Sequence, residues 1–307
     1  MTTARPAAAT TDALFRWIEE REREHCSSFG NAWGRVLDAG TGRHSLTWLL
    51  RGTATPDRIT DVVAVTGETP LANDLTAAFD KESTRLTVRV GNWQDATFLA
   101  KEQTFDVIIA DYLVGAMEGF APYYQDEICA RLEELLTPGG RIYLVGLQPL
   151  SESQAPADGS NNDLELLETG KLIQEVARTR DACLLLAGRR VYREFPIEWS
   201  QRQLEKAGMA VTDSVRFVNV YTRAGITRQL EVGRRYVPLL KDTALRDHLF
   251  QALDRLDQRI EEKFGSANAA HDEQRKIRFG FDYVVAARKA TIPRAGAGTS
   301  KGEPDVQ

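Results

Sequence analysis

Apolar and polar residues follow two different periods along the chain, one typical of strands and the other typical of helices. Runs that are apolar throughout or at every second position predict strands, and they fall at residues 36–38, 61–65, 86–90, 105–110, 141–147, 209–221 and 279–287. Apolar residues spaced three or four apart predict helices at residues 12–23, 46–50, 71–79, 128–136, 163–186, 198–207, 224–240 and 243–264. Because strands and helices follow one another along most of the chain, the pattern predicts an α/β fold.

The first predicted strand leads into a glycine-containing turn. Residues 36–37 are followed by Asp38, Gly40 and Gly42, and a helical pattern then continues to Gly52. Glycine allows backbone conformations closed to other residues and lets a ligand approach the main chain, while the helix start presents unpaired N–H groups. An acid at the end of the strand would repel a pyrophosphate but suits a ligand with an ammonium group. A turn that only joins a strand to a helix is the alternative.

Two motifs resemble those of the class I S-adenosylmethionine (SAM)-dependent methyltransferases. Asp38-Ala39-Gly40-Thr41-Gly42 is similar to motif I of that family, and Leu136-Thr137-Pro138-Gly139-Gly140 before an apolar run is similar to a second landmark. The second motif is chemically only a helix stop and a turn, but its separation from the first is that of the family. The resemblance implies a Rossmann-like, seven-stranded, mostly parallel sheet with the last strand antiparallel and helices on both faces. It also implies SAM as the cofactor.

The resemblance places SAM at the carboxyl ends of the strands, where open α/β sheets bind ligands. The family normally has an acid directly after the second strand to bind the ribose. This chain has Thr66 there, and the nearest acid is Glu68, which either reaches the ribose or is a solvated loop residue. Trp93 could contact the adenine or belong to the core. The residues expected to bind SAM are Asp38, Gly40, Thr41, Gly42, Glu68, Asn92, Trp93 and Asp111.

Catalysis of methyl transfer does not require a dedicated side chain, because alignment for in-line displacement supplies much of the rate. A base is needed when the acceptor is a hydroxyl or a protonated amine. The candidates at the crevice are Asp111, Tyr112 and His44, with Glu118 close in sequence. His44 lies in the first turn of a predicted helix, where the helix dipole disfavours a cationic ring. It could instead pack near the methionine part of SAM.

The segment after the fourth strand, residues 112–124, is rich in aromatic residues. Such residues suit the wall of a pocket for an apolar or cationic acceptor, although they could also bury a helix end. Arginines cluster near residues 189–193 and 234–236, and they imply a carboxylate or phosphate on the acceptor if they face the crevice. A solvated surface is the alternative. The residues expected to bind the acceptor are Glu118, Tyr123, Tyr124, Tyr192 and Arg193.

The chain is longer than the family core requires, and the excess lies in two helical insertions that we expect to form a lid over the acceptor. The expected organisation is an N-terminal helix or cap at 1–30, a SAM-binding core at 31–150, an insertion at 151–195, core again at 196–222, a second insertion at 223–275, a final strand at 276–289 and a flexible tail at 290–307. An apolar stripe from Leu245 to Phe264 indicates packing within the chain or against a partner, which allows a homodimer.

The composition limits which classes of partner and which cellular compartment we expect for this protein. A net charge of −5 gives no electrostatic footprint for nucleic acid, and no apolar run approaches the roughly 20 residues of a membrane span. Cys26, Cys129 and Cys183 are far apart and odd in number, which argues against a disulfide framework or a zinc site. We therefore expect a cytoplasmic protein that acts on a small molecule, without a metal, nucleic acid or membrane partner.

Other classes remain open at this stage. An aminopropyltransferase would fit Asp111 but needs an acid directly after the second strand. A protein arginine methyltransferase would carry two glutamates after the fourth strand, where this chain has only Glu118. An NAD-linked oxidoreductase is disfavoured by Asp38 and by Ser45 at the third glycine position. A methyltransferase fold kept for binding or regulation would fit the departure at Thr66, and absence of SAM binding would decide for it.

Overall fold

The computed structural model describes most of the chain, and the side chains of residues 26–29 and 163–167 are outside that description. The described residues are 12–29, 33–52, 58–150, 163–265 and 277–291. The first residues of the predicted cap, parts of both insertions and the predicted tail from residue 292 onward therefore lie outside the described residues.

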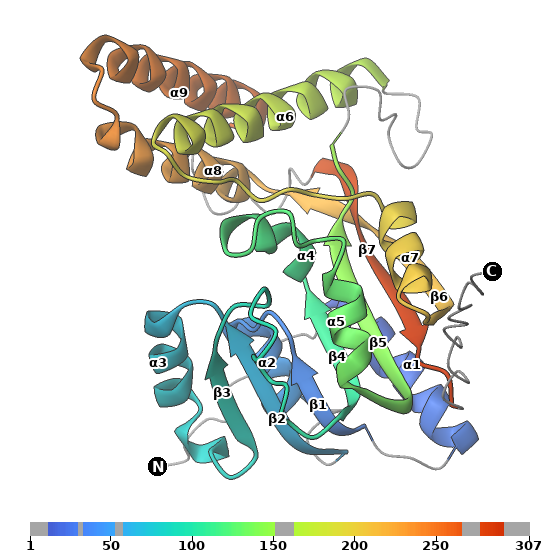
Figure 1. Ribbon diagram of the computed structural model, residues 1–307. Helices are drawn as coiled ribbons and strands as arrows, with labels where there is room; N and C mark the ends of the chain where they lie inside the picture. Colours follow the sequence, from blue (N-terminus) through green and yellow to red (C-terminus); the bar gives the residue numbers. More distant parts are fainter. Residues whose placement is uncertain (1–11, 30–32, 53–57, 151–162, 266–276, 292–307) are drawn as a thin grey trace, which may run out of the picture.

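A seven-stranded sheet forms the centre of the protein (Figure 1). Its strands are β1 (Gly34–Asp38), β2 (Ile59–Thr66), β3 (Leu86–Val90), β4 (Phe105–Asp111), β5 (Leu136–Leu147), β6 (Ala210–Tyr221) and β7 (Ile277–Arg288). They are arranged in the order β3-β2-β1-β4-β5-β7-β6. Strands β1 to β5 pair in parallel, whereas β7 runs antiparallel to both β5 and β6. The predicted sheet, with its last strand antiparallel, is confirmed.

Helices cover both faces of this sheet because its central strands are buried on both sides. Helices α1 (Ala13–Phe29), α2 (Arg43–Arg51) and α3 (Thr69–Ala78) pack on the face that contains Val36 and Val107, and the turn η1 (Asp80–Glu82) follows α3. Helices α4 (Leu113–Ala116), α5 (Ile128–Leu135) and α7 (Ile197–Lys206) pack on the face that contains Leu37 and Ile108. Successive strand residues thus enter opposite cores, as the pleat of a strand requires.

Three further helices form a separate bundle beyond α4, at the end of the sheet where the parallel strands finish (Figure 1). This three-helix bundle consists of α6 (Asp163–Leu186), α8 (Arg223–Tyr236) with its extension η3 (Val237–Leu239), and α9 (Thr243–Phe264). Leu253, Leu256, Ile260 and Phe264 of the predicted stripe are buried inside it. The stripe therefore packs within the chain, and a homodimer stays a prediction.

Two predicted segments differ from the structure. The turn expected at residues 137–140 is a bulge inside β5, because Leu136 pairs with Phe105 and the ladder resumes only where Arg141 pairs with Val107. The segment at 112–124, predicted as a loop, contains α4 and the turn η2 (Met117–Gly119). Short helices were missed there because four-residue helices carry too few positions to show a period.

A buried ion pair ties α1 to β5. The carboxylate of Glu22, which is fully buried, accepts hydrogen bonds from Arg141 at 2.9 and 2.6 Å and from the Tyr143 hydroxyl at 2.6 Å. Removing one member of a buried pair leaves the other charge uncompensated, at a cost of about 3–5 kcal/mol. We expect Glu22→Ala to lower the free energy of unfolding in urea by that amount.

The exposed Glu24, which pairs with Arg21 on the same helix, provides the control for this prediction. Its pair is an i,i+3 surface contact, so Glu24→Ala should cost less than about 1 kcal/mol. Equal losses in the two variants would contradict a structural role for the buried pair.

Candidate active site

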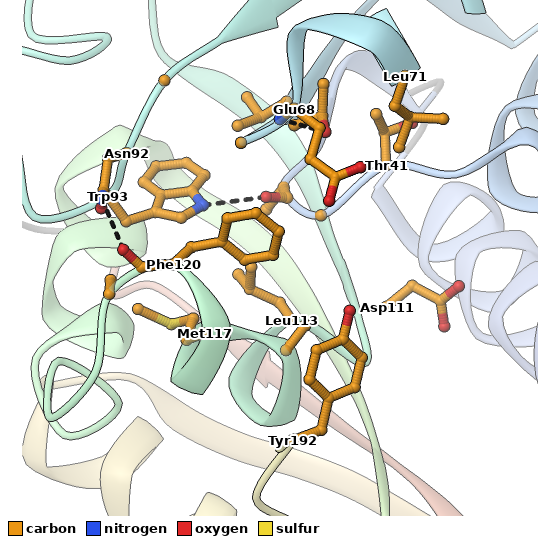
Figure 2. Close-up of a pocket in the computed structure, with 18 residues that line it drawn as sticks. Thr41, Glu68, Leu71, Asn92, Trp93, Asp111, Leu113, Met117, Phe120 and Tyr192 are labelled. Atoms are coloured by element: carbon orange, nitrogen blue, oxygen red, sulfur yellow. Dashed lines mark hydrogen bonds between the residues drawn. The ribbon is translucent and has the colours of Figure 1, made fainter. Parts of the chain in front are cut away.

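A cavity of about 210 Å³ lies where the strand order reverses between β1 and β4 (Figure 2). Four strand ends contribute to its wall, as expected for a ligand site at the switch point of an open α/β sheet. The strand ends contribute residues 39–41 after β1, residues 65–68 and Leu71 at and after the end of β2, residues 91–93 after β3, and Asp111 at the end of β4. The rest of the lining consists of residues of α4 and η2, Phe120, Ala121 and Tyr192.

Asp38 lies behind the glycine turn and does not line the cavity. It is fully buried, and its Oδ2 atom accepts hydrogen bonds from the hydroxyls of Thr41 and Ser45, both at 2.7 Å. Ser45 also accepts a hydrogen bond from the backbone N–H of Gly42 at 3.1 Å. Burial raises the pKa of Asp38 to about 6, against the opposing effect of the two hydroxyls. Asp38 therefore shapes the turn, and Gly42 also lies outside the cavity wall.

Thr66, which stands at the end of β2 where the resemblance predicted an acid, has a structural role. This residue is buried, and its hydroxyl accepts a hydrogen bond from the backbone N–H of Glu68 at 3.1 Å. The Glu68 side chain lines the cavity, and Figure 2 shows its carboxylate turned toward Thr41. Gly67 lies between Thr66 and Glu68 in the sequence, and a Cβ atom on it would lie 2.7 Å from the ring of Phe120. Glycine there lets the Phe120 ring pack against the main chain.

The loop after β3 holds two other parts of the site in place. The indole N–H of Trp93 donates to the backbone oxygen of Ala39 at 3.1 Å, and the amide of Asn92 donates to the backbone oxygen of Phe120 at 2.7 Å (Figure 2). Trp93 is 5% exposed and belongs to the core while one side of it lines the cavity. The interpretation of Trp93 as a core residue is therefore confirmed, and its contact with an adenine stays a prediction.

Asp111 brings an unpaired carboxylate to the cavity. Its Oδ1 atom is buried and has no hydrogen-bond partner among the described residues. Burial is the main cause that raises the pKa of Asp111 to about 7, and the charges of Asp38, Asp12 and Asp282 add to it. A carboxyl group in this position favours a positively charged ligand, whose charge would compensate that of the ionised form.

The other two predicted catalytic residues lie outside the cavity wall. Tyr112 has a left-handed backbone (φ 49°), and its hydroxyl is hydrogen bonded to Asp282. Burial raises the pKa of Tyr112 far above its usual range, so the hydroxyl stays neutral and is a poor base. His44 is exposed on α2, 3.8 Å from Asp12 and with its ring edge on to Phe15. The helix start directs it away from the cavity.

The residues predicted to bind the acceptor meet a second, larger cavity of about 1290 Å³. We call it the chamber; it lies between the η2 segment and the three-helix bundle. Glu118, Tyr123 and Arg193 line the chamber, and Tyr192 lines both cavities. Tyr124 lines neither, because its ring packs on the core beside α5.

Glu118 has a structural partner on each side. It is 5% exposed and accepts hydrogen bonds from Gln125 at 2.9 Å and from Arg190 at 2.6 Å. Burial alone would raise the pKa of Glu118, but these bonds and the charge of Arg193 hold it below its usual range. Glu118 is therefore ionised and holds Arg190 in place.

Three residues of this region were not predicted as site residues from the sequence. Phe120 stands at the cavity, while Glu194 and Asp282 lie close to one another and carry pKa values raised by burial to about 7 and about 6. Asp282 had a signal in the sequence, since it is a charge within an otherwise apolar strand pattern at 279–287. Phe120 belongs to the aromatic segment 112–124 that was predicted as a pocket wall, whereas Glu194 had no such signal in the sequence.

The described part of the chain contains no group of three histidine, cysteine, aspartate or glutamate side chains arranged to hold a metal ion. Over the same residues, no helix combines the length and apolar character that crossing a membrane requires. Cys129 and Cys183 are buried and free.

The strand order, the antiparallel β7 and the cavity beside the glycine turn define the class I SAM-dependent methyltransferase fold. No protein-family model matches the sequence. Among solved structures, the chain is similar to the YcgJ protein from Bacillus subtilis, with a TM-score of 0.52 and 15% identity over 90% of this chain and 98% of the other. It is also similar to BH2331 from Bacillus halodurans C-125, a candidate methyltransferase, with a TM-score of 0.50 and 14% identity over 89% and 99% of the two chains.

Proposed function

We propose that this protein is a SAM-dependent methyltransferase that acts on a small-molecule acceptor. The observation that carries the proposal is the convergence of the glycine turn, Glu68, the Asn92–Trp93 loop and the unpaired Asp111 on one cavity. These groups come from four strand ends that are distant in sequence. Their chemistry matches a ligand with a sugar, a flat base and a positive charge.

The residues present fit SAM group by group. Glu68 and Trp93 both line the cavity, where Glu68 would accept hydrogen bonds from the ribose hydroxyls and Trp93 would contact the adenine. The buried Oδ1 atom of Asp111 suits the ammonium or sulfonium charge. The cavity of about 210 Å³ is below the roughly 300–1,000 Å³ of usual ligand sites. Phe120, which is 39% exposed, would therefore turn aside when the cofactor enters.

When bound, SAM supplies a methyl group on a positively charged sulfur atom. The protein contributes alignment, because the glycine turn fixes one end of the ligand and the second cavity adjoins the other side of Tyr192. An acceptor atom would form its new bond to the methyl carbon with its own electron pair, while the bond between that carbon and the sulfur would break and leave its electron pair on sulfur, so that S-adenosylhomocysteine remains. Where the acceptor must lose a proton, Asp111 is a carboxylate at the cavity that can take it.

The three-helix bundle would then act as the lid. Its helices lie over the carboxyl ends of the parallel strands (Figure 1), where they can exclude water from the reacting groups.

Calorimetric titration with SAM, S-adenosylhomocysteine and NAD tests this function. We expect micromolar binding of the first two ligands and none of NAD, followed by formation of S-adenosylhomocysteine when SAM is incubated with an acceptor. A protein that binds neither SAM nor its product would contradict the proposal and favour a methyltransferase fold kept for another kind of binding.

A further inference from the structure

The chamber is a large cavity next to the cavity that we assign to SAM. Its volume of about 1290 Å³ exceeds the usual range for drug-sized ligands, and its wall shares Tyr192 with the cofactor cavity. Figure 2 shows Tyr192 below Leu113, with its hydroxyl turned toward the cofactor cavity. An acceptor seated in the chamber would therefore meet the methyl donor at Tyr192.

One wall of the chamber is apolar. It is formed by side chains of α6 and α8, among them Ile173, Val176, Leu184, Ile226 and Val232. Leu184 is only half-buried, whereas Ile173, Val176 and Ile226 are buried and belong to the core of the three-helix bundle. A surface of this kind binds an apolar body, because removing apolar area from water is favourable in proportion to that area.

The charged side chains of the chamber are mainly arginines. Five arginines and three acidic residues line it. Arg180 pairs with Asp181 at 2.6 Å, and Arg190 pairs with Glu118 at 2.6 Å. The third acid, Glu194, has a pKa raised to about 7 by burial, so its negative charge is only partly present at neutral pH.

Arg189 and Arg193 take no part in these ion pairs. Both are exposed, and neither side chain has an ion pair or hydrogen bond with a described residue, although the charge of Arg193 helps to lower the pKa of Glu118. Beside them, Arg190 is held by the buried Glu118 and lies over the ring of Tyr123 at 5.3 Å from its centroid. Three guanidinium groups in one short segment thus border a chamber that has one apolar wall, and two of them can form hydrogen bonds with a ligand.

We propose that the chamber binds a methyl acceptor with a large apolar body and an anionic group, and that Arg189 and Arg193 bind the anion. The inference rests on the proposed function for its reaction, but the binding itself can be measured without methyl transfer. A carboxylate or a phosphate would serve equally, since the planar guanidinium group pairs with either through two parallel hydrogen bonds.

Matched probes that differ only in the sign of their charge test the proposal. The full-length protein, saturated with S-adenosylhomocysteine, is titrated in a calorimeter with decanoate and with decylammonium, and then with 1-naphthylacetate and 1-naphthylmethylammonium. We expect at least one anion to bind about tenfold or more tightly than its cationic partner. The two pairs also show whether the apolar body is an acyl chain or an aromatic ring.

Variants then identify the groups responsible. Arg189→Gln combined with Arg193→Gln should remove the preference for the anion while the affinity for S-adenosylhomocysteine stays unchanged. Arg234→Gln is the control, because Arg234 lies on α8, other residues of which line the chamber, but it pairs with Asp254 at 2.7 Å and does not itself line the chamber. It should keep the preference.

The outcomes separate the two proposals. Binding of S-adenosylhomocysteine without preference for either anion, or with preference for the cations, would overturn the anion site and leave the methyltransferase function standing. An anion preference that survives in the double variant would overturn the role of the two arginines. Failure to bind S-adenosylhomocysteine would instead contradict the proposed function.

Discussion

Asp111→Asn is expected to bind SAM about a hundredfold more weakly than the unchanged protein and yet to be more stable at neutral pH. The affinity falls because the ligand would lose the charge of a carboxylate at the cavity whose buried Oδ1 atom has no hydrogen-bond partner among the described residues, and a hydrogen bond to a charged group is worth about 1.5–3 kcal/mol. The stability rises because the amide has the shape of the carboxyl group and carries no charge that burial penalises.

The pH dependence follows from the same carboxyl group. Its pKa is about 7 in the folded protein and 3.8 as a reference for the unfolded chain, so the folded state binds more protons between these values. Stability without ligand therefore falls as pH rises from about 4 to 7. SAM prefers the ionised carboxylate, so its affinity should rise with pH up to about 7 and then level off.

Thermal unfolding at several pH values and calorimetry at the same values check both effects. Asp282→Asn is the control, because Asp282 also has a raised pKa but lines neither cavity. That variant should gain stability at neutral pH and keep its affinity for SAM within a few fold. Unchanged SAM affinity in Asp111→Asn would show that this carboxylate does not contact the ligand.

Asp38→Ala should also abolish measurable SAM binding, although Asp38 does not line the cavity. Its carboxylate is the shared acceptor for the hydroxyls of Thr41 and Ser45, and Ser45 in turn holds the N–H of Gly42. Alanine would leave the buried Thr41 hydroxyl without this acceptor, at about 1–3 kcal/mol, and would leave Ser45 only the backbone oxygen of Gly42, at 3.1 Å, as an acceptor. The turn would relax and its backbone would no longer fit the ligand.

Asp38→Asn separates this explanation from a direct contact with SAM. Asparagine keeps one oxygen that can accept from a hydroxyl, so part of the turn geometry and a measurable affinity should remain. Calorimetric titration of both variants, with circular dichroism to confirm folding, gives the comparison. Near-normal affinity in Asp38→Ala would refute the importance of the motif in this chain.

The sheet was predictable from sequence because its strands are buried on both faces. Runs such as 61–65 and 105–110 have almost no polar residues, and such runs need no knowledge of their neighbours to be recognised. The landmarks at residues 38–42 and 136–140 then fixed the order of the strands through the family resemblance. Asp111 was predictable for the same reason, as the polar residue at the end of an apolar run.

Other parts of the site depend on contacts between distant segments, which no local pattern contains. Asp38 was expected to face the ligand, but its role in the turn depends on the rotamers of Thr41 and Ser45. The two arginine clusters look alike in sequence. Arg193 lines the chamber, whereas Arg234 pairs with Asp254 within the bundle. Helix phase and the packing of α8 against α9 decide this difference.

The position of β7 has a consequence for how the protein assembles during synthesis. This last strand lies between β5 and β6, and β6 has no other neighbour in the sheet. Before the ribosome has made the residues from Ile277 onward, β6 has no strand to pair with in this sheet. At that stage only the strands β1 to β5 can form their hydrogen bonds with one another. The sheet is thus completed when β7 inserts between β5 and β6. A nascent chain halted before that point would expose the unpaired backbone groups of β5 and β6, which chaperones could bind.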